Sequence, residues 1–117
     1  MAIVALYEAA GTISATEISL PNATTYAAGS AIATDGIYQI FLDLNAMAAG
    51  DMFELKVYEK VQAAGTQRIV CIFNFVGVQA APHTVLPTFI FMHGWDVTLK
   101  KITGTDRSLA WSIRQVA

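Results

Sequence analysis

The chain has 117 residues, of which 55% are hydrophobic and only 14% are charged, and its formal net charge is −2. This length suits a single domain whose core needs no disulfide or metal. An ordinary soluble domain has about 25% charged residues, so this chain has more apolar area than a small interior can hold. The surplus must face lipid, a ligand or another protein. Nucleic-acid binding is not expected, because contacts to phosphates need a basic excess.

Neither a membrane span nor a targeting peptide is predicted. A spanning helix needs about 20 consecutive apolar residues, but the run from Met1 stops at Glu8 and the run from Ile69 stops at Asn74. The first ten residues also lack the basic stretch of a secretory signal. Another protein chain is therefore the expected cover for the apolar surplus.

The first ten residues form an apolar segment that ends before Gly11. They suit equally well the first strand of the core or an extended arm that pairs with the sheet edge of a neighbouring subunit. The residues that would make such contacts are Ile3, Val4, Leu6 and Tyr7. Residues 11–117 form the body of the single domain, and within it residues 12–20 alternate weakly, which predicts an edge strand.

Three strands are predicted in the middle of the chain. Residues 36–44 follow an Asp-Gly turn signal and are rich in strand-forming side chains. Residues 52–61 alternate between apolar and polar side chains, and this register points Tyr58 outward between Lys56 and Lys60. Residues 67–78 are apolar on both faces, which predicts a central strand buried on both sides. The outward Tyr58 is the first candidate for an interface contact.

The last third of the chain predicts several short strands, over residues 83–86, 88–92, 95–103 and 108–116. The turns at residues 65–68 and 104–107 have similar sequences, which predicts two similar hairpins. The Ala-rich stretches 27–33 and 44–49 are too short for stable helices. Seven to eight short strands separated by turn signals predict an all-β antiparallel sandwich, with a jelly-roll-like arrangement favoured.

No catalytic or metal-binding set is visible in the sequence. His83 and His93 lack the further ligands that a zinc site needs, and Cys71 is the only cysteine, which suits a small buried side chain. Glu54 and Glu59 are next to lysines, which indicates ion pairs on a solvated face. We therefore expect neither an enzyme nor a cofactor.

Aromatic residues are the more informative side chains, because protein interfaces are enriched in them. Phe73, Phe75 and Trp111 occupy strand positions that suit a core, whereas Trp95 joins Tyr58 as an interface candidate. A small carbohydrate-binding sandwich is a different possibility. In that case Trp95 and Trp111 would be exposed stacking platforms.

Several short segments between residues 34 and 114 resemble those of small structural proteins from tailed phages. They are Thr34-Asp35-Gly36-Ile37-Tyr38 leading to Asp43, Gly50-Asp51 with Glu54-Leu55 and Lys60, Gly65-Thr66-Gln67-Arg68, Thr98-Leu99-Lys100, and Gly104-Thr105-Asp106-Arg107 followed by Trp111.

The proteins that these segments resemble are similar to head decoration, or cement, proteins. The resemblance implies a virion protein, assembled in the host cytoplasm, that binds the major capsid protein as a homo-oligomer, often a trimer. A tail, baseplate or head-fibre component is the alternative within the same class. The resemblance assigns no functional residue, and residues before Thr34 lie outside it.

Overall fold

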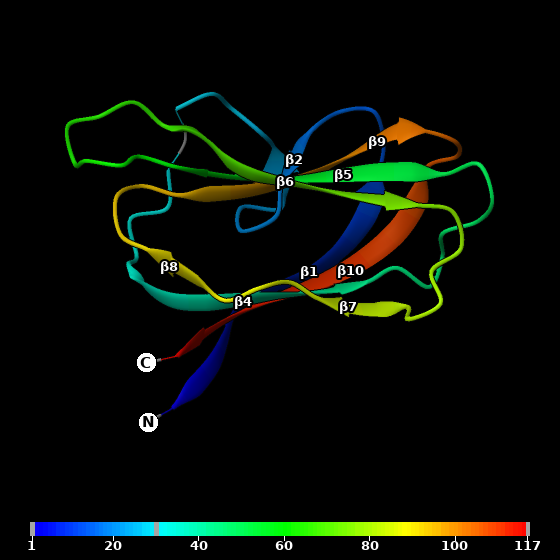
Figure 1. The fold of residues 1–117 in the computed structure, drawn as a ribbon, viewed down its shortest axis with the longest axis horizontal. Helices are drawn as coiled ribbons and strands as arrows, with labels where there is room; N and C mark the ends of the chain where they lie inside the picture. Colours follow the sequence, from blue (N-terminus) through cyan, green and yellow to red (C-terminus); the bar gives the residue numbers. More distant parts are fainter. Residues whose placement is uncertain (1, 30, 117) are drawn as a thin grey trace.

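Two antiparallel β-sheets pack face to face in the computed structural model, which describes residues 2–29 and 31–116 (Figure 1). The first sheet contains β1 (Ile3–Ile13), β10 (Arg107–Val116) and β4 (Gly36–Asp43) in that order, with β7 (His83–Val85) and β8 (Phe89–Phe91) both paired to β4. The second sheet has the order β3 (Thr24–Thr25), β2 (Ile18–Ser19), β9 (Asp96–Thr103), β5 (Met52–Glu59) and β6 (Arg68–Val76).

The connections are those of a jelly roll. With β7 and β8 counted as one interrupted strand, every connection crosses to the other sheet except the β2–β3 and β5–β6 hairpins. The expected all-β, jelly-roll-like sandwich is therefore confirmed. The described residues form ten strands rather than the expected seven to eight. The number is larger because it includes four very short strands: β2 and β3 have two residues each, and β7 and β8 have three each.

The core lies between the sheets and follows the period of two in the long strands. Side chains of β4, β5 and β10 alternate between buried and partly exposed positions, and β9 adds Val97 and Leu99. An aromatic cluster fills one end, where the Trp95 ring lies 4.5 Å from Phe91 and 4.7 Å from Tyr38 between ring centroids. Burial of each such large side chain contributes about 1.5–3 kcal/mol to folding.

The prediction for residues 67–78 is wrong in one respect. The strand β6 exists, but it pairs only with β5 and forms the edge of its sheet instead of its centre. One face packs Phe73 and Phe75 toward the core, whereas Val70, Ile72 and Val76 are exposed. Apolar side chains on both faces of a strand show only that neither face is charged. This pattern cannot show whether the second face is covered by the protein's own second sheet or by an external partner.

Two local predictions also change. The predicted edge strand over residues 12–20 is divided, because β1 extends to Ile13 and the chain forms strand again only at Ile18–Ser19. The turn after β5 closes a hairpin as expected, but the similar turn after β9 does not, since β9 and β10 lie in different sheets. The stretches 27–33, whose residue 30 lies outside the described part, and 44–49 show no helix.

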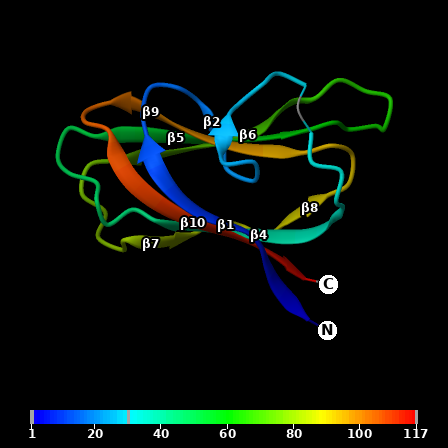
Figure 2. The ribbon, with the colours of Figure 1, turned by 180° about the vertical axis from the view of Figure 1, so that it is seen from behind.

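The N-terminal segment lies in the chain's own sheet. The strand β1 continues through Gly11 and pairs with β10 from Ile3 to Ile13, with a register shift between Ala5 and Tyr7. Residue 1 lies outside the described residues. Both chain ends emerge close together from the same end of the sandwich (Figures 1 and 2).

Candidate interaction surface

The predicted contacts of the N-terminal segment lie at this end of the sandwich. Ile3 is 70% exposed, and Val4 and Leu6 are also exposed. Tyr7 is only partly exposed, because its ring packs edge-on against Trp95 with 5.9 Å between centroids. Ile3, Val4 and Leu6 are thus accessible for a contact with another chain, and their role in an interface remains a prediction.

The expectation that Tyr58 is available for an interface is wrong. Its side chain is 8% exposed, because Tyr26 stacks on its ring at 4.7 Å between centroids. The Tyr58 hydroxyl donates a hydrogen bond of 2.6 Å to Glu17. Burial and the neighbouring Glu17 carboxylate raise the pKa of Tyr58. The segment carrying Glu17 and Tyr26 covers this part of the sheet, and no pattern within residues 52–61 could indicate it.

Trp95 is fully buried, so its predicted interface role is also wrong. Its indole Nε1 donates a 2.9 Å hydrogen bond to the carbonyl oxygen of Thr34. Trp111 is buried as expected, and its Nε1 donates to the carbonyl oxygen of Leu20 over 3.0 Å. Since neither ring can stack on a sugar, the carbohydrate-binding alternative loses both of its platforms.

The main exposed apolar surface lies in a stretch that contains no charged residue. The 27 residues from Ile69 to Trp95 include no Lys, Arg, Asp or Glu, and they form β6, β7 and β8. Eight of the fourteen large hydrophobic side chains described as exposed belong to this stretch: Ile69, Val70, Ile72, Val76, Val78, Val85, Ile90 and Met92.

We call this surface the uncharged side. Phe73 of β6 and Phe89 of β8 meet edge-on at 6.4 Å between ring centroids, which joins the edges of the two sheets there. The sequence interpretation buried residues 67–78 on both sides and so missed their part of this surface. The absence of charge over the whole stretch from Ile69 to Trp95 was the available signal.

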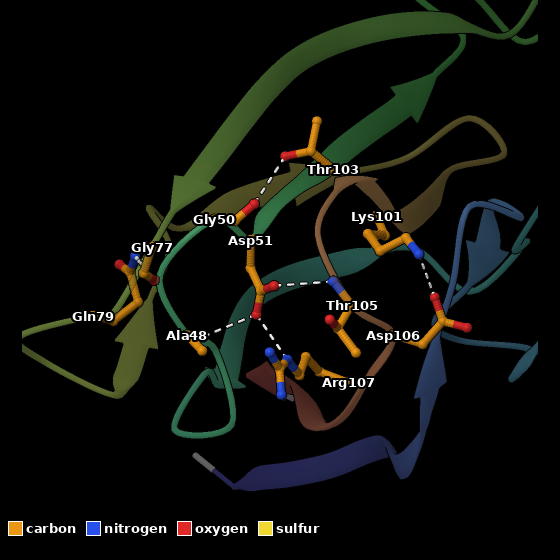
Figure 3. Close-up of polar contacts among 10 residues, drawn as sticks. All are labelled: Ala48, Gly50, Asp51, Gly77, Gln79, Lys101, Thr103, Thr105, Asp106 and Arg107. Atoms are coloured by element: carbon orange, nitrogen blue, oxygen red, sulfur yellow. Dashed lines mark hydrogen bonds and ion pairs between the residues drawn. The ribbon is translucent and has the colours of Figure 1, made fainter.

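The motifs at Gly50-Asp51 and residues 104–107 meet at one end of the sandwich (Figure 3). The buried Asp51 carboxylate accepts hydrogen bonds from Ala48 N at 2.9 Å, Arg107 Nε at 2.7 Å and Thr105 N at 3.1 Å. These donors lower the pKa of Asp51 to about 2, with Arg107 the largest cause. The junction ties the loop before β5 to the turn before β10, which is a structural role.

A shallow groove of about 480 Å³ crosses the outer face of the first sheet. The Arg114 guanidinium lies 3.7 Å above the Phe41 ring centre, and Arg114 Nε donates to Ser112 Oγ over 3.2 Å. Ser112 Oγ in turn donates to Glu8 Oε2 over 3.0 Å. These polar groups hold one another across β1, β10 and β4.

Within residues 2–29 and 31–116, no group of three or more His, Cys, Asp or Glu is placed to hold a metal ion. The same residues include no helix long and apolar enough to cross a membrane. Cys71 is partly buried, and this burial raises the pKa of its thiol. A raised pKa disfavours the reactive thiolate form.

In comparisons with known proteins, no family model matches the chain, and no match is found among curated proteins or solved structures. The surface of the chain itself therefore provides the basis for its function.

Proposed function

We propose that this protein is a non-enzymatic structural subunit of a tailed-phage virion, and specifically a head decoration protein that binds the capsid shell as a homo-oligomer. The observation that supports this most directly is the uncharged side. Isolated exposed apolar residues are common on soluble proteins, but this stretch of 27 residues carries eight of them and no charged residue, and extensive apolar surface marks contact with other molecules. A subunit that functions within an assembly has its apolar exterior covered there.

The structural roles of the motif residues are consistent with this proposal. Asp51 and Arg107 hold two loops together, and Trp111 is a core residue that bonds to Leu20. These are the segments that carry the resemblance to phage structural proteins. In this chain these residues link loops and pack in the core, which makes the sandwich rigid. A protein that stabilises a shell requires such rigidity.

The two apolar surfaces suit two kinds of contact. The uncharged side suits contacts between copies, which can close into a symmetric oligomer and so avoid open-ended association. The separate group formed by Ile3, Val4 and Leu6 lies beside the chain ends and suits contact with the major capsid protein. The trimer implied by the resemblance is one form that the oligomer can take.

The test is reconstitution on phage heads that lack this protein. Purified protein should co-sediment with the heads and appear on their outer faces by cryo-electron microscopy. Density on the tail or baseplate would contradict the decoration role while keeping the virion role. Absence of the protein from purified virions would contradict both.

A variant defines the shell contact more sharply. Replacing Ile3, Val4 and Leu6 together with Ser should weaken head binding at least about tenfold, the equivalent of 1.4 kcal/mol, and leave the fold intact. Val61→Ser is the matched control, because Val61 is the most exposed of the large hydrophobic side chains described and lies in the β5–β6 turn. Equal binding by both variants would remove these three residues from the shell contact.

A further inference from the structure

The second sheet ends in a strand whose outer edge faces no other strand of the described chain. The strand β6 pairs with β5 only. Val57 pairs with Cys71 and Tyr58 pairs with Ile69, so Val70 is an extra residue that bulges from β6. From Cys71 to Val76 the pairing is regular. This segment therefore presents an ordered row of backbone groups that can extend the sheet.

The other sheet edges are protected from such pairing. The strand β1 carries Glu8 and a register shift, β3 has two residues, and β7 and β8 have three each. Short strands, charges and bulges are the usual means by which proteins prevent edge pairing. Between Cys71 and Val76, β6 has no charge, no proline and no bulge. Ile72 at its centre is 47% exposed.

We infer that β6 pairs with β6 of a second copy of this chain, antiparallel about a two-fold axis. This inference rests on the proposed function, since it names one contact of the proposed oligomer, and it makes that oligomer two-fold instead of the trimer that the resemblance implies. The charge of β6 favours this pairing. An uncharged segment brings no like charges together in any register against itself. Arg68 precedes the segment, and antiparallel pairing places the two Arg68 side chains at opposite ends, whereas parallel pairing would place them side by side.

Two-fold pairing also gives a closed assembly. A two-fold contact uses the β6 edge of both copies at once. The joined sheet then ends at β3 of each copy, which has only two residues and cannot template further pairing. The bulge at Val70 and the hairpin turn before it limit the pairing segment to its regular part. The contact therefore forms a dimer instead of a fibre.

The test is the mass of the full chain in solution, measured by size-exclusion chromatography with light scattering. Wild-type protein should be a dimer in the micromolar range. Ile72→Lys and Ile72→Glu should each raise the dimer dissociation constant at least about tenfold, because both strands of the short paired segment then carry the same charge. An equimolar mixture of the two variants should restore the dimer. This recovery also shows that both variants are folded.

Ile37→Lys is the matched control, since Ile37 is 42% exposed, close to the exposure of Ile72, and lies on β4 of the other sheet, and it should leave the dimer unchanged. A monomeric wild type, or an oligomer of any size that persists in Ile72→Lys, would overturn the inference. Binding of a monomer to phage heads would overturn the inference and the homo-oligomer, and it would leave the decoration role in place. A dimer that depends on β6, in a protein that is absent from virions, would support the inference and contradict the proposed function.

Discussion

The hydroxyl of Ser19 donates a hydrogen bond of 2.7 Å to Oδ1 of Asp96, and both side chains are buried. Oδ1 also accepts from Val97 N at 2.8 Å, whereas Oδ2 has no hydrogen-bond partner among the described residues. Burial raises the pKa of Asp96 above its usual value of 3.8, and the nearby Glu17 adds to this effect. One oxygen of this carboxyl group is thus well bonded, and the other favours the protonated form.

The raised pKa of Asp96 predicts that ionisation of its carboxyl group lowers the free energy of unfolding as pH rises. The folded state binds the Asp96 proton more tightly than the unfolded state does. This tighter binding stabilises the fold fully at low pH, and the stabilisation is lost as pH rises through the folded pKa. Asp96→Asn should therefore become more stable relative to wild type as pH rises from about 4 to 7. Urea unfolding at several pH values measures this difference. A difference that is independent of pH would show that Asp96 is ionised throughout that range.

Asp51 should show the opposite dependence. Its folded pKa of about 2 lies below the usual 3.8, so its contribution to stability is present above about pH 4 and is lost as pH falls toward 2. Asp51→Asn should be less stable than wild type at neutral pH, and the two unfolding free energies should converge in acid. Arg107→Gln should retain part of this dependence, because Ala48 N and Thr105 N still donate to the carboxylate. Parallel pH profiles for wild type and Asp51→Asn would contradict the assignment.

A glycine is required at position 104 for two reasons, its left-handed backbone and the lack of space for a Cβ atom. Gly50 shares only the first reason, so a comparison of the two positions separates the two effects. Both residues have left-handed backbone conformations, with φ of 96° and 91°. An added Cβ at Gly104 would lie 2.3 Å from Asp51 Oδ1 and 2.7 Å from Asp51 Cα, whereas at Gly50 it would meet nothing within 4 Å. Gly50→Ala should cost about 1–2 kcal/mol from backbone strain, and Gly104→Ala should cost clearly more. Thermal unfolding of the pair tests this, and equal losses would contradict the clash.

Tyr58→Phe should destabilise the fold through the loss of one hydrogen bond to a carboxylate. Thr98 Oγ1 still donates to Glu17 Oε2, so the expected loss is about 1.5–3 kcal/mol, typical of a bond to a charged group. Tyr26→Phe is the control, because its hydroxyl donates to the neutral Gln67 Oε1, and about 1 kcal/mol is expected. Denaturant unfolding compares the two variants. A smaller loss for Tyr58→Phe would show that solvent replaces its hydroxyl at Glu17.

Strand prediction succeeded where one face of a strand is buried. The clean alternation of residues 52–61 and 108–116 corresponds to β5 and β10, whose inward side chains build the core. Local pattern failed where covering elements come from elsewhere in the chain. Tyr58 has the register of a solvated face, but Glu17 and Tyr26 lie across it. Trp95 looked like an interface residue, and only the packing of Phe91 and Tyr38 shows that it is central to the core.

The sequence alone determined the fold class, since period-two alternation and frequent turns are local consequences of strand geometry. It also determined that the surface would be poor in charge, because composition does not depend on how the chain folds. The order of strands in each sheet was decided by tertiary structure, and with it the position of β6 at an edge. Which apolar residues remain exposed depends on contacts between residues far apart in the chain, and neither periodicity nor composition contains this information.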